Sequence, residues 1–186
     1  SRIMELGCPE GKVLVTGNLK FDLSITPKEV LIDKFEPLKA QTRDKQLFVA
    51  GSTHQGEEEQ ILDMFRQVLQ NFPNLLLIIA PRHLDRIPKI VDLIQLKGFI
   101  PVLKSKLPGI SKLPTAAVIL LDTLGELSSL YGLATLVFVG GSLVPVGGHN
   151  ILEVAAHGIP PVFGPHMFNF KEIAYLIKEE GGGWQI

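Results

Sequence analysis

The chain has 186 residues, a length typical of one domain. Hydrophobic residues make up 46% and charged residues 20%, so a sizeable core can form and disorder is excluded. The balance of 18 basic against 19 acidic residues argues against a nucleic-acid-binding surface, which needs concentrated positive charge. The single cysteine, Cys8, excludes an internal disulfide and a cysteine-based metal cluster, and it fits a reducing cytosol.

The mean hydropathy of +0.27 is high and would fit a chain with membrane segments. The longest apolar runs, residues 75–80, 116–121 and 136–139, are far shorter than the roughly 20 residues that span a bilayer. They are bounded by Pro, Asn, Asp and Gly, which is typical of strands buried on both faces of a sheet. The first five residues do not resemble a signal peptide.

Short apolar runs alternate with segments of helical periodicity. Apolar residues recur at helical spacing within 31–38, 61–69, 87–94 and 170–177. The expected strands are 12–16, 47–50, 75–80, 100–103, 117–121, 136–139 and 161–163. Alternating strands and helices predict an α/β fold, a Rossmann-like, doubly wound parallel sheet with helices on both faces.

In such folds ligands bind beyond the carboxyl ends of the strands. The segments that follow the expected strands carry most of the unusual chemistry of this chain. They are 51–57 (GSTHQGE), 81–83 (PRH), 122–126 (DTLGE), 140–150 (GGSLVPVGGHN) and 164–166 (GPH).

The segment Gly147–Asn150 predicts a glycine turn into a helix that Asn150 caps. Free amides of that first turn could hold a phosphate, and Glu153 could accept hydrogen bonds from ribose hydroxyls. The alternative is a capping box, since Asn150 followed three residues later by Glu153 begins many helices without any ligand.

Two further strand ends offer candidate ligand groups. Arg82 could clamp a phosphate or a carboxylate, or could form a surface ion pair with Asp85. The segment 122–127 could read a nucleobase edge through its backbone amides, although spacing alone favours a simple Asp or Thr helix cap.

Four histidines, His54, His83, His149 and His166, are expected on one rim of the sheet. Their spacing matches no metal motif, so contacts to phosphate or substrate hydroxyls are preferred over a metal site. The dinucleotide fingerprint, the P-loop and the nucleophile elbow do not occur, so dehydrogenase, P-loop kinase and α/β-hydrolase functions are disfavoured.

Seven ordered strings together resemble the 3-deoxy-D-manno-octulosonic acid (Kdo) transferase family over essentially the whole chain. They are 15–22 (VTGNLKFD), 51–54 (GSTH), 80–83 (APRH), 122–127 (DTLGEL), 138–143 (FVGGSL), 147–150 (GGHN) and 164–166 (GPH) with Asn169 and Phe170. The resemblance implies the C-terminal, nucleotide-donor half of a two-domain GT-B glycosyltransferase, here covering residues 1–186.

The resemblance also implies donor-site residues. Contacts to CMP-Kdo are expected from Pro81, Arg82, Leu124, Gly125, Glu126, Asn150, Ile151, Leu152 and Glu153. Additional contacts are considered at Ser52, Thr53, His54, Gly141, Ser142 and His149. Ile151 stands where the family commonly has proline, a change that should matter little at a first helical turn. No cofactor and no metal are expected.

The family's reaction, as the resemblance implies it, is inverting transfer of Kdo from CMP-Kdo to the lipid A precursor in lipopolysaccharide synthesis. The catalytic carboxylate, the acceptor site and the membrane contact belong to an N-terminal domain outside this chain. We therefore expect an excised domain or a fragment with no catalytic residue of its own, from a protein at the cytoplasmic side of the bacterial inner membrane. The alternatives are a UDP-sugar-dependent GT-B transferase or epimerase, and a non-enzymatic nucleotide-binding module.

Overall fold

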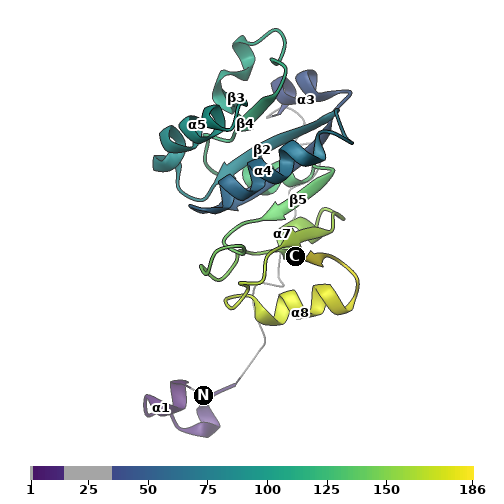
Figure 1. The fold of residues 1–186 in the computed structure, drawn as a ribbon. Coiled ribbons are helices and arrows are strands. Elements are labelled where there is room, and N and C mark those ends of the chain that lie inside the picture. The colour runs from purple at the N-terminus through teal and green to yellow at the C-terminus, as the bar shows by residue number, and fades with distance from the viewer. Residues whose placement is uncertain (1, 15–34) are drawn as a thin grey trace.

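The computed structural model describes residues 2–14 and 35–186 (Figure 1). Before the sheet come α1 (Arg2–Glu5), the 3-10 helix η1 (Glu10–Lys12) and α3 (Glu36–Thr42). The expected strand at 12–16 is wrong in its described part, because Lys12 ends η1 and the Val13 amide donates to the Glu10 carbonyl at 3.1 Å. Its last two residues, the string 15–22 and the start of the 31–38 helix lie outside the described residues.

Seven strands of the described chain form one sheet in the order β3-β4-β2-β1-β5-β6-β7, and every neighbouring pair is parallel. Their bounds are β1 (Gln46–Thr53), β2 (Leu75–Pro81), β3 (Ile100–Leu103), β4 (Ala117–Leu120), β5 (Leu136–Val139), β6 (Pro161–Phe163) and β7 (Trp184–Gln185). Six of them confirm expected strands. The exposed, two-residue β7 was not expected, because it has no apolar run.

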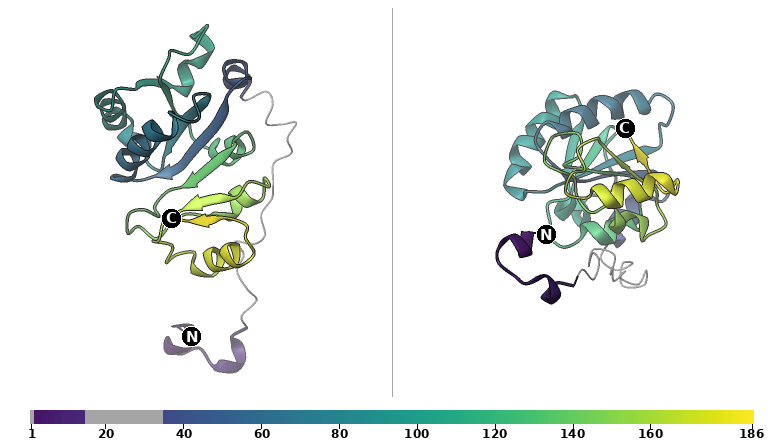
Figure 2. Two further views of the ribbon diagram at one scale, coloured as in Figure 1. Left: turned by 45° about the vertical axis from the view of Figure 1, so that its right-hand side comes forward. Right: turned by 90° about the horizontal axis from the view of Figure 1, so that it is seen from below.

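Helices cover both faces of the sheet, which confirms the doubly wound α/β architecture (Figure 2). On one face α4 (Glu57–Val68) and α5 (Ile87–Leu96) pack on alternate strand residues such as Phe48 and Ile79. On the other face α3, α6 (Leu127–Tyr131), α7 (Leu152–Ala155) and α8 (Lys171–Glu179) pack on Val49 and Ile78. Two short 3-10 helices, η3 (Leu84–Arg86) and η4 (Lys104–Gly109), follow β2 and β3. In the described part, no helix is long and apolar enough to cross a bilayer.

The strand order reverses at the centre of the sheet. The chain runs outward from β1 through β2 to β3 and β4, then returns to the other side of β1 as β5. The helices after β1 and β5 therefore cover opposite faces of the sheet, and open α/β sheets bind ligands beyond the strand ends at such a reversal. Because all the paired strands are parallel, the segments that follow β2, β4 and β6 begin at the same, carboxyl edge of the sheet.

Candidate functional site

A cavity of about 390 Å³ lies at this carboxyl edge, a size within the usual range for small-molecule sites. Its walls come from the ends of β1 and β2, the β4–α6 segment, α6, the start of α7 and the residue before α8. The lining residues are Ser52, Arg82, Gly125, Leu127, Ser128, Tyr131, His149, Asn150, Glu153 and Phe170. Six of these residues were expected at the donor site from the sequence.

The end of β1 shapes the floor of the cavity. Ser52 and Thr53 belong to this strand and not to the loop after it. Ser52 has a φ of 53°, an uncommon conformation for a non-glycine residue. A Cβ on Gly51 would come within 2.1 Å of the buried Tyr131 hydroxyl, so only glycine lets Tyr131 pack there. Burial raises the pKa of Tyr131, whose hydroxyl is hydrogen-bonded to Ser52 and stays neutral at physiological pH.

Arg82 provides a positive charge at the cavity wall. It follows Pro81, the buried last residue of β2, and its backbone amide donates to the Thr53 carbonyl at 3.0 Å. Among residues 2–14 and 35–186, the exposed Arg82 guanidinium has no ion pair, so the suggested pair with Asp85 is not formed. Burial has the largest effect on the pKa of both neighbours, lowering that of His149 and raising that of Glu153. The Arg82 charge lowers both pKa values. The guanidinium is therefore placed to meet an anion.

The start of α7 differs from the expected capping by one residue. The N-cap is Ile151, whose fully buried side chain leaves only its backbone for a ligand. Asn150 Oδ1 accepts from the Leu152 amide at 3.2 Å, while Asn150 Nδ2 donates to Glu153 Oε1 at 3.4 Å. Because Glu153 binds the Asn150 side chain and not its backbone amide, the capping-box alternative is wrong.

Glu153 lies half-buried beside this amide. Burial raises the pKa of the Glu153 carboxyl, and the Asn150 hydrogen bond and Arg82 oppose that rise. The carboxyl therefore lines the cavity as an acceptor whose ionised form Arg82 stabilises. α7 has only four residues, so its amide dipoles form too short a stack to bind an anion without side-chain help.

The β4–α6 segment presents backbone to the cavity. Gly125 has a φ of 74° and lines the cavity, and Leu124 is 81% exposed. Glu126 is nearly buried and bonded to Lys104 Nζ at 2.9 Å, and Thr123 donates to it as well. The expected Asp or Thr cap is absent from this described helix start, since Glu126 is the N-cap residue and Asp122 instead accepts from Ser105.

Three of the four rim histidines form a cluster. The rings of His54 and His149 stack with their Nε2 atoms 2.8 Å apart, and His83 contacts His54 edge-on. Since one Nε2 must donate and the other accept, the accepting ring is neutral when the two rings pair. Burial lowers the pKa of His54, and it lowers that of His149 to about 4 with help from His54.

His166 lies apart from this cluster, next to α8 residues such as Lys171 and Tyr175. No group of three His, Cys, Asp or Glu side chains among the described residues is arranged to hold a metal ion.

Three of the additional expected residues face inward. The Thr53 hydroxyl donates to Glu58 Oε1 at 2.8 Å. The Gly141 amide donates to Glu57 and the Gly141 carbonyl accepts from Gly148. The Ser142 amide, hydroxyl and carbonyl all bond within the protein. These groups already make their hydrogen bonds within the protein, so direct contact between them and a bound nucleotide does not fit the structure.

Sequence reasoning missed several residues of this region. Ser128 and Tyr131 line the cavity from α6, whereas the expectation for that stretch ended at Leu127. Phe170 also lines the cavity, but it was placed only in a helical pattern and in a string of the resemblance, not at the donor site. Glu57 was seen as part of a strand-end segment, and the turn Gly56-Glu57 carried no signal that its side chain reaches residues 141–143 after β5.

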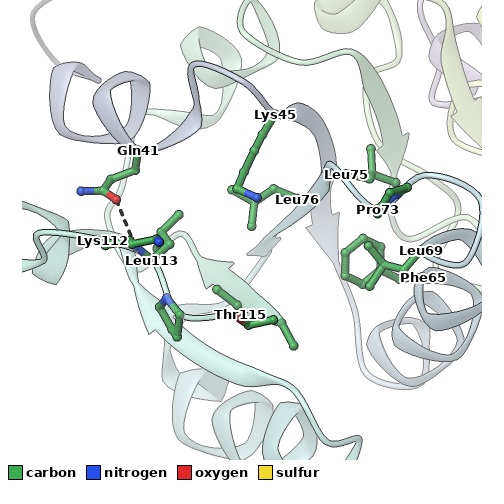
Figure 3. Close-up of a pocket in the computed structure, with 13 residues that line it drawn as sticks. Gln41, Lys45, Phe65, Leu69, Pro73, Leu75, Leu76, Lys112, Leu113 and Thr115 are labelled. Carbon is green, nitrogen blue, oxygen red and sulfur yellow. Dashed lines mark hydrogen bonds between the residues drawn. The ribbon is translucent and has the colours of Figure 1, made fainter.

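A cavity of about 470 Å³ lies at the opposite, amino edge of the sheet (Figure 3). Its lining is apolar apart from Gln41, Lys45, Lys112 and Thr115, and Gln41 Oε1 accepts from the Leu113 amide at 3.1 Å. Parallel sheets bind ligands at the other edge, and Figure 3 shows no convergent polar groups except that internal bond. We therefore place the functional site at the carboxyl edge.

Comparison with known proteins identifies the family of this chain. The chain is 42% identical over 185 residues to a 3-deoxy-D-manno-octulosonic acid transferase of Haemophilus influenzae, covering 97% of this chain and 42% of that protein. It is 31% identical over 175 residues to the enzyme of that name from Aquifex aeolicus, covering 94% of this chain and 44% of that protein. The chain thus spans less than half the length of these relatives. No family model matches it.

A solved structure resembles the whole fold. The C-terminal CMP-Kdo binding domain of WaaA from Acinetobacter baumannii superposes with a TM-score of 0.75 and 34% sequence identity, covering 85% of this chain and 82% of that one. That domain has the fold of the C-terminal half of a GT-B glycosyltransferase. The chain therefore belongs to the 3-deoxy-D-manno-octulosonic acid transferase family, and it corresponds to the C-terminal domain of that family.

Proposed function

We propose that this chain binds CMP-Kdo in the carboxyl-edge cavity and serves as the donor domain of a Kdo transferase. The observation that carries the proposal is the convergence of Arg82, Gly125, Asn150 and Glu153 on one cavity at the strand-order reversal. These residues come from three separate segments, and the related Acinetobacter baumannii domain is a CMP-Kdo binding domain.

Each part of the nucleotide has a candidate partner. The phosphate takes the Arg82 guanidinium, whose planar fork can donate two parallel hydrogen bonds. The ribose hydroxyls donate to the Glu153 carboxylate, which Asn150 orients. The cytosine edge meets the backbone around Gly125, where no side chain intervenes. Arg82 and the backbone amides at the start of α7 neutralise the leaving phosphate without a metal.

The chemical step extends beyond this chain. Inverting transfer needs a general base near the acceptor hydroxyl, and we assign that base and the lipid A precursor site to another domain. This domain lowers the barrier by stabilising the charge that develops on departing CMP. The full protein then acts at the cytoplasmic side of the bacterial inner membrane, with membrane contact outside this chain.

Calorimetric titration of the 186-residue chain with CMP, UMP and AMP tests the proposal. Because only one wall of a two-domain cleft is present, CMP affinity is expected to be about −4 to −6 kcal/mol, with UMP and AMP weaker. Equal binding of all three nucleotides would contradict it, and tighter UMP binding would favour a UDP-sugar enzyme. The same chain should transfer no Kdo to lipid A precursor, whereas turnover would show that it carries its own base.

A further inference from the structure

Glu57, in the first turn of α4, is fully buried and accepts four backbone hydrogen bonds. Its Oε2 accepts from the amides of His54 and Gly141, each at 2.8 Å. Its Oε1 accepts from the amides of Ser142 at 3.0 Å and Leu143 at 2.9 Å. These four donors fill about as many acceptor sites as a carboxylate offers.

The three successive amides of residues 141–143 form a concave site for an anion. In nucleotide-binding proteins such nests commonly cradle a phosphate. Here the Glu57 carboxylate occupies the nest, so the nest is closed to a ligand phosphate. The close approach of β1 and β5 makes this possible, because a Cβ on Gly140 would lie 2.4 Å from the Ser52 carbonyl oxygen.

Both segments that Glu57 holds contact the segment that lines the cavity. The Gly141 carbonyl accepts from the Gly148 amide at 2.7 Å. His54, whose amide Glu57 holds, pairs through its ring with His149 at 2.8 Å. Glu57 thus holds Gly141, which bonds to Gly148, and His54, which pairs with His149. Gly148 and His149 directly precede Asn150.

We propose that Glu57 is the positioning residue of the donor site: it replaces a phosphate in the 141–143 nest and thereby sets His149 and Asn150 against the cavity. It touches no ligand itself. This inference rests on the proposed function for its nucleotide readout, and a second readout is independent of any nucleotide.

Glu57→Gln tests the proposal, because it keeps the side-chain size but turns an NH₂ group toward backbone amides. Well below its melting temperature, this variant is expected to bind CMP at least ten-fold more weakly than the parent. The matched control is Ile61→Ala, one turn further along α4, which removes apolar packing but none of the four hydrogen bonds that Glu57 accepts. It should lower the melting temperature and keep CMP affinity within two-fold.

The histidine rings supply the second readout. In a long-range ¹H–¹⁵N NMR spectrum, the parent should show one protonated and one unprotonated Nε2 for the His54–His149 pair. Glu57→Asp keeps the charge but is too short to reach all four amides, so it should lose this signature and weaken CMP binding by a smaller factor. If Glu57→Gln fails to fold, Glu57→Asp still tests the proposal.

Two results would overturn the inference. One is a folded Glu57→Gln or Glu57→Asp protein with the parental histidine signature, and the other is an Ile61→Ala protein that loses CMP affinity equally. If the parent itself binds no CMP while the Glu57 variants lose the histidine signature, the proposed function fails and the positioning role stands.

Discussion

The two walls of the carboxyl-edge cavity are built differently. The inner wall, residues 52–58 and 140–143, lies behind the cavity and lines it only at Ser52. It makes its polar contacts within the protein, chiefly to the buried carboxylates Glu57 and Glu58. The outer wall presents Arg82, Gly125, Asn150 and Glu153 to the cavity. Of these, the Arg82 guanidinium has no ion pair within residues 2–14 and 35–186.

This difference separates two tasks. A polar group whose hydrogen bonds are made internally adds rigidity and position, and removing its partner mainly affects stability. A polar group facing the cavity is available to a ligand, and removing it mainly affects binding. The comparison predicts which substitutions change stability and which change CMP affinity.

The largest expected effect is on stability at the inner wall. Glu58 is 1% exposed and binds Arg86 through two hydrogen bonds of 2.8 and 2.9 Å. Glu58→Gln should reduce the free energy of unfolding by about 3–5 kcal/mol, because it leaves a largely buried guanidinium without its counter-charge. Urea denaturation measures the loss.

The control for this variant is Asp63→Asn on the same helix. Asp63 is 51% exposed in its pair with Lys97, so its loss should change stability by less than ~1 kcal/mol. Equal losses from the two variants would show that burial does not distinguish these ion pairs.

The next effect is on binding at the outer wall. Arg82→Ala should weaken CMP binding at least ten-fold with little change in melting temperature, since a charge-assisted contact contributes about 1.5–3 kcal/mol. Lys89→Ala removes the same charge from an exposed position on α5 and should leave CMP affinity unchanged. An Arg82→Ala protein that binds CMP like the parent would remove Arg82 from the site.

The histidine pair predicts a pH effect where the two walls meet. The folded-state pKa values of His54 and His149 lie below the unfolded value of 6.5, that of His149 at about 4, so the unfolded state binds more protons. Stability present above pH 6.5 is therefore lost as pH falls toward 4, by roughly 1–2 kcal/mol after allowance for partial exposure.

Thermal melts between pH 7.5 and 4 measure this loss. His149→Gln should flatten the slope between pH 6.5 and 4, while a variant of the distant His166 should keep it. An unchanged slope in His149→Gln would assign the pH dependence to other groups.

The smallest expected effect is at the start of α7. Asn150→Ala removes the acceptor of the Leu152 amide and should lower stability by about 1 kcal/mol. It should weaken CMP binding less than Arg82→Ala, because the change reaches the ligand only through the orientation of Glu153. Asn150→Ser keeps an acceptor for the Leu152 amide without adding a charge beside Glu153, and it should recover most of the stability. A larger binding loss from Asn150→Ala than from Arg82→Ala would place the main phosphate contact at α7.

Much of the fold was predictable from local pattern. Continuous apolar runs such as residues 75–80 predict parallel strands, because such a sheet is buried on both faces and needs no alternation. The expected run at 12–16 failed in its described part because its amides bond locally at Pro9 and Glu10. The exposed β7 has no apolar signal, and it is recognisable only by its pairing with β6.

The candidate site was predictable to a similar extent. Strand-end position marked Arg82 and Gly125, because a parallel sheet brings its carboxyl ends together, and the predicted helix start after Asn150 marked Glu153. The same reasoning could not separate cavity residues from inward ones, so Thr53, Gly141 and Ser142 were placed with the ligand contacts. Burial and hydrogen-bond partners made that separation.

Local periodicity and turn residues encode six of the seven described strands, three long helices and the polar strand ends, so these features could be predicted from sequence. The use of those polar groups depends on the assembled fold. Glu57 lies 84 residues before Gly141 in the chain, and a carboxylate in a first helical turn has the same local pattern whether it faces solvent or a loop. Its partners depend on where β1 and β5 meet, which is a property of the assembled sheet.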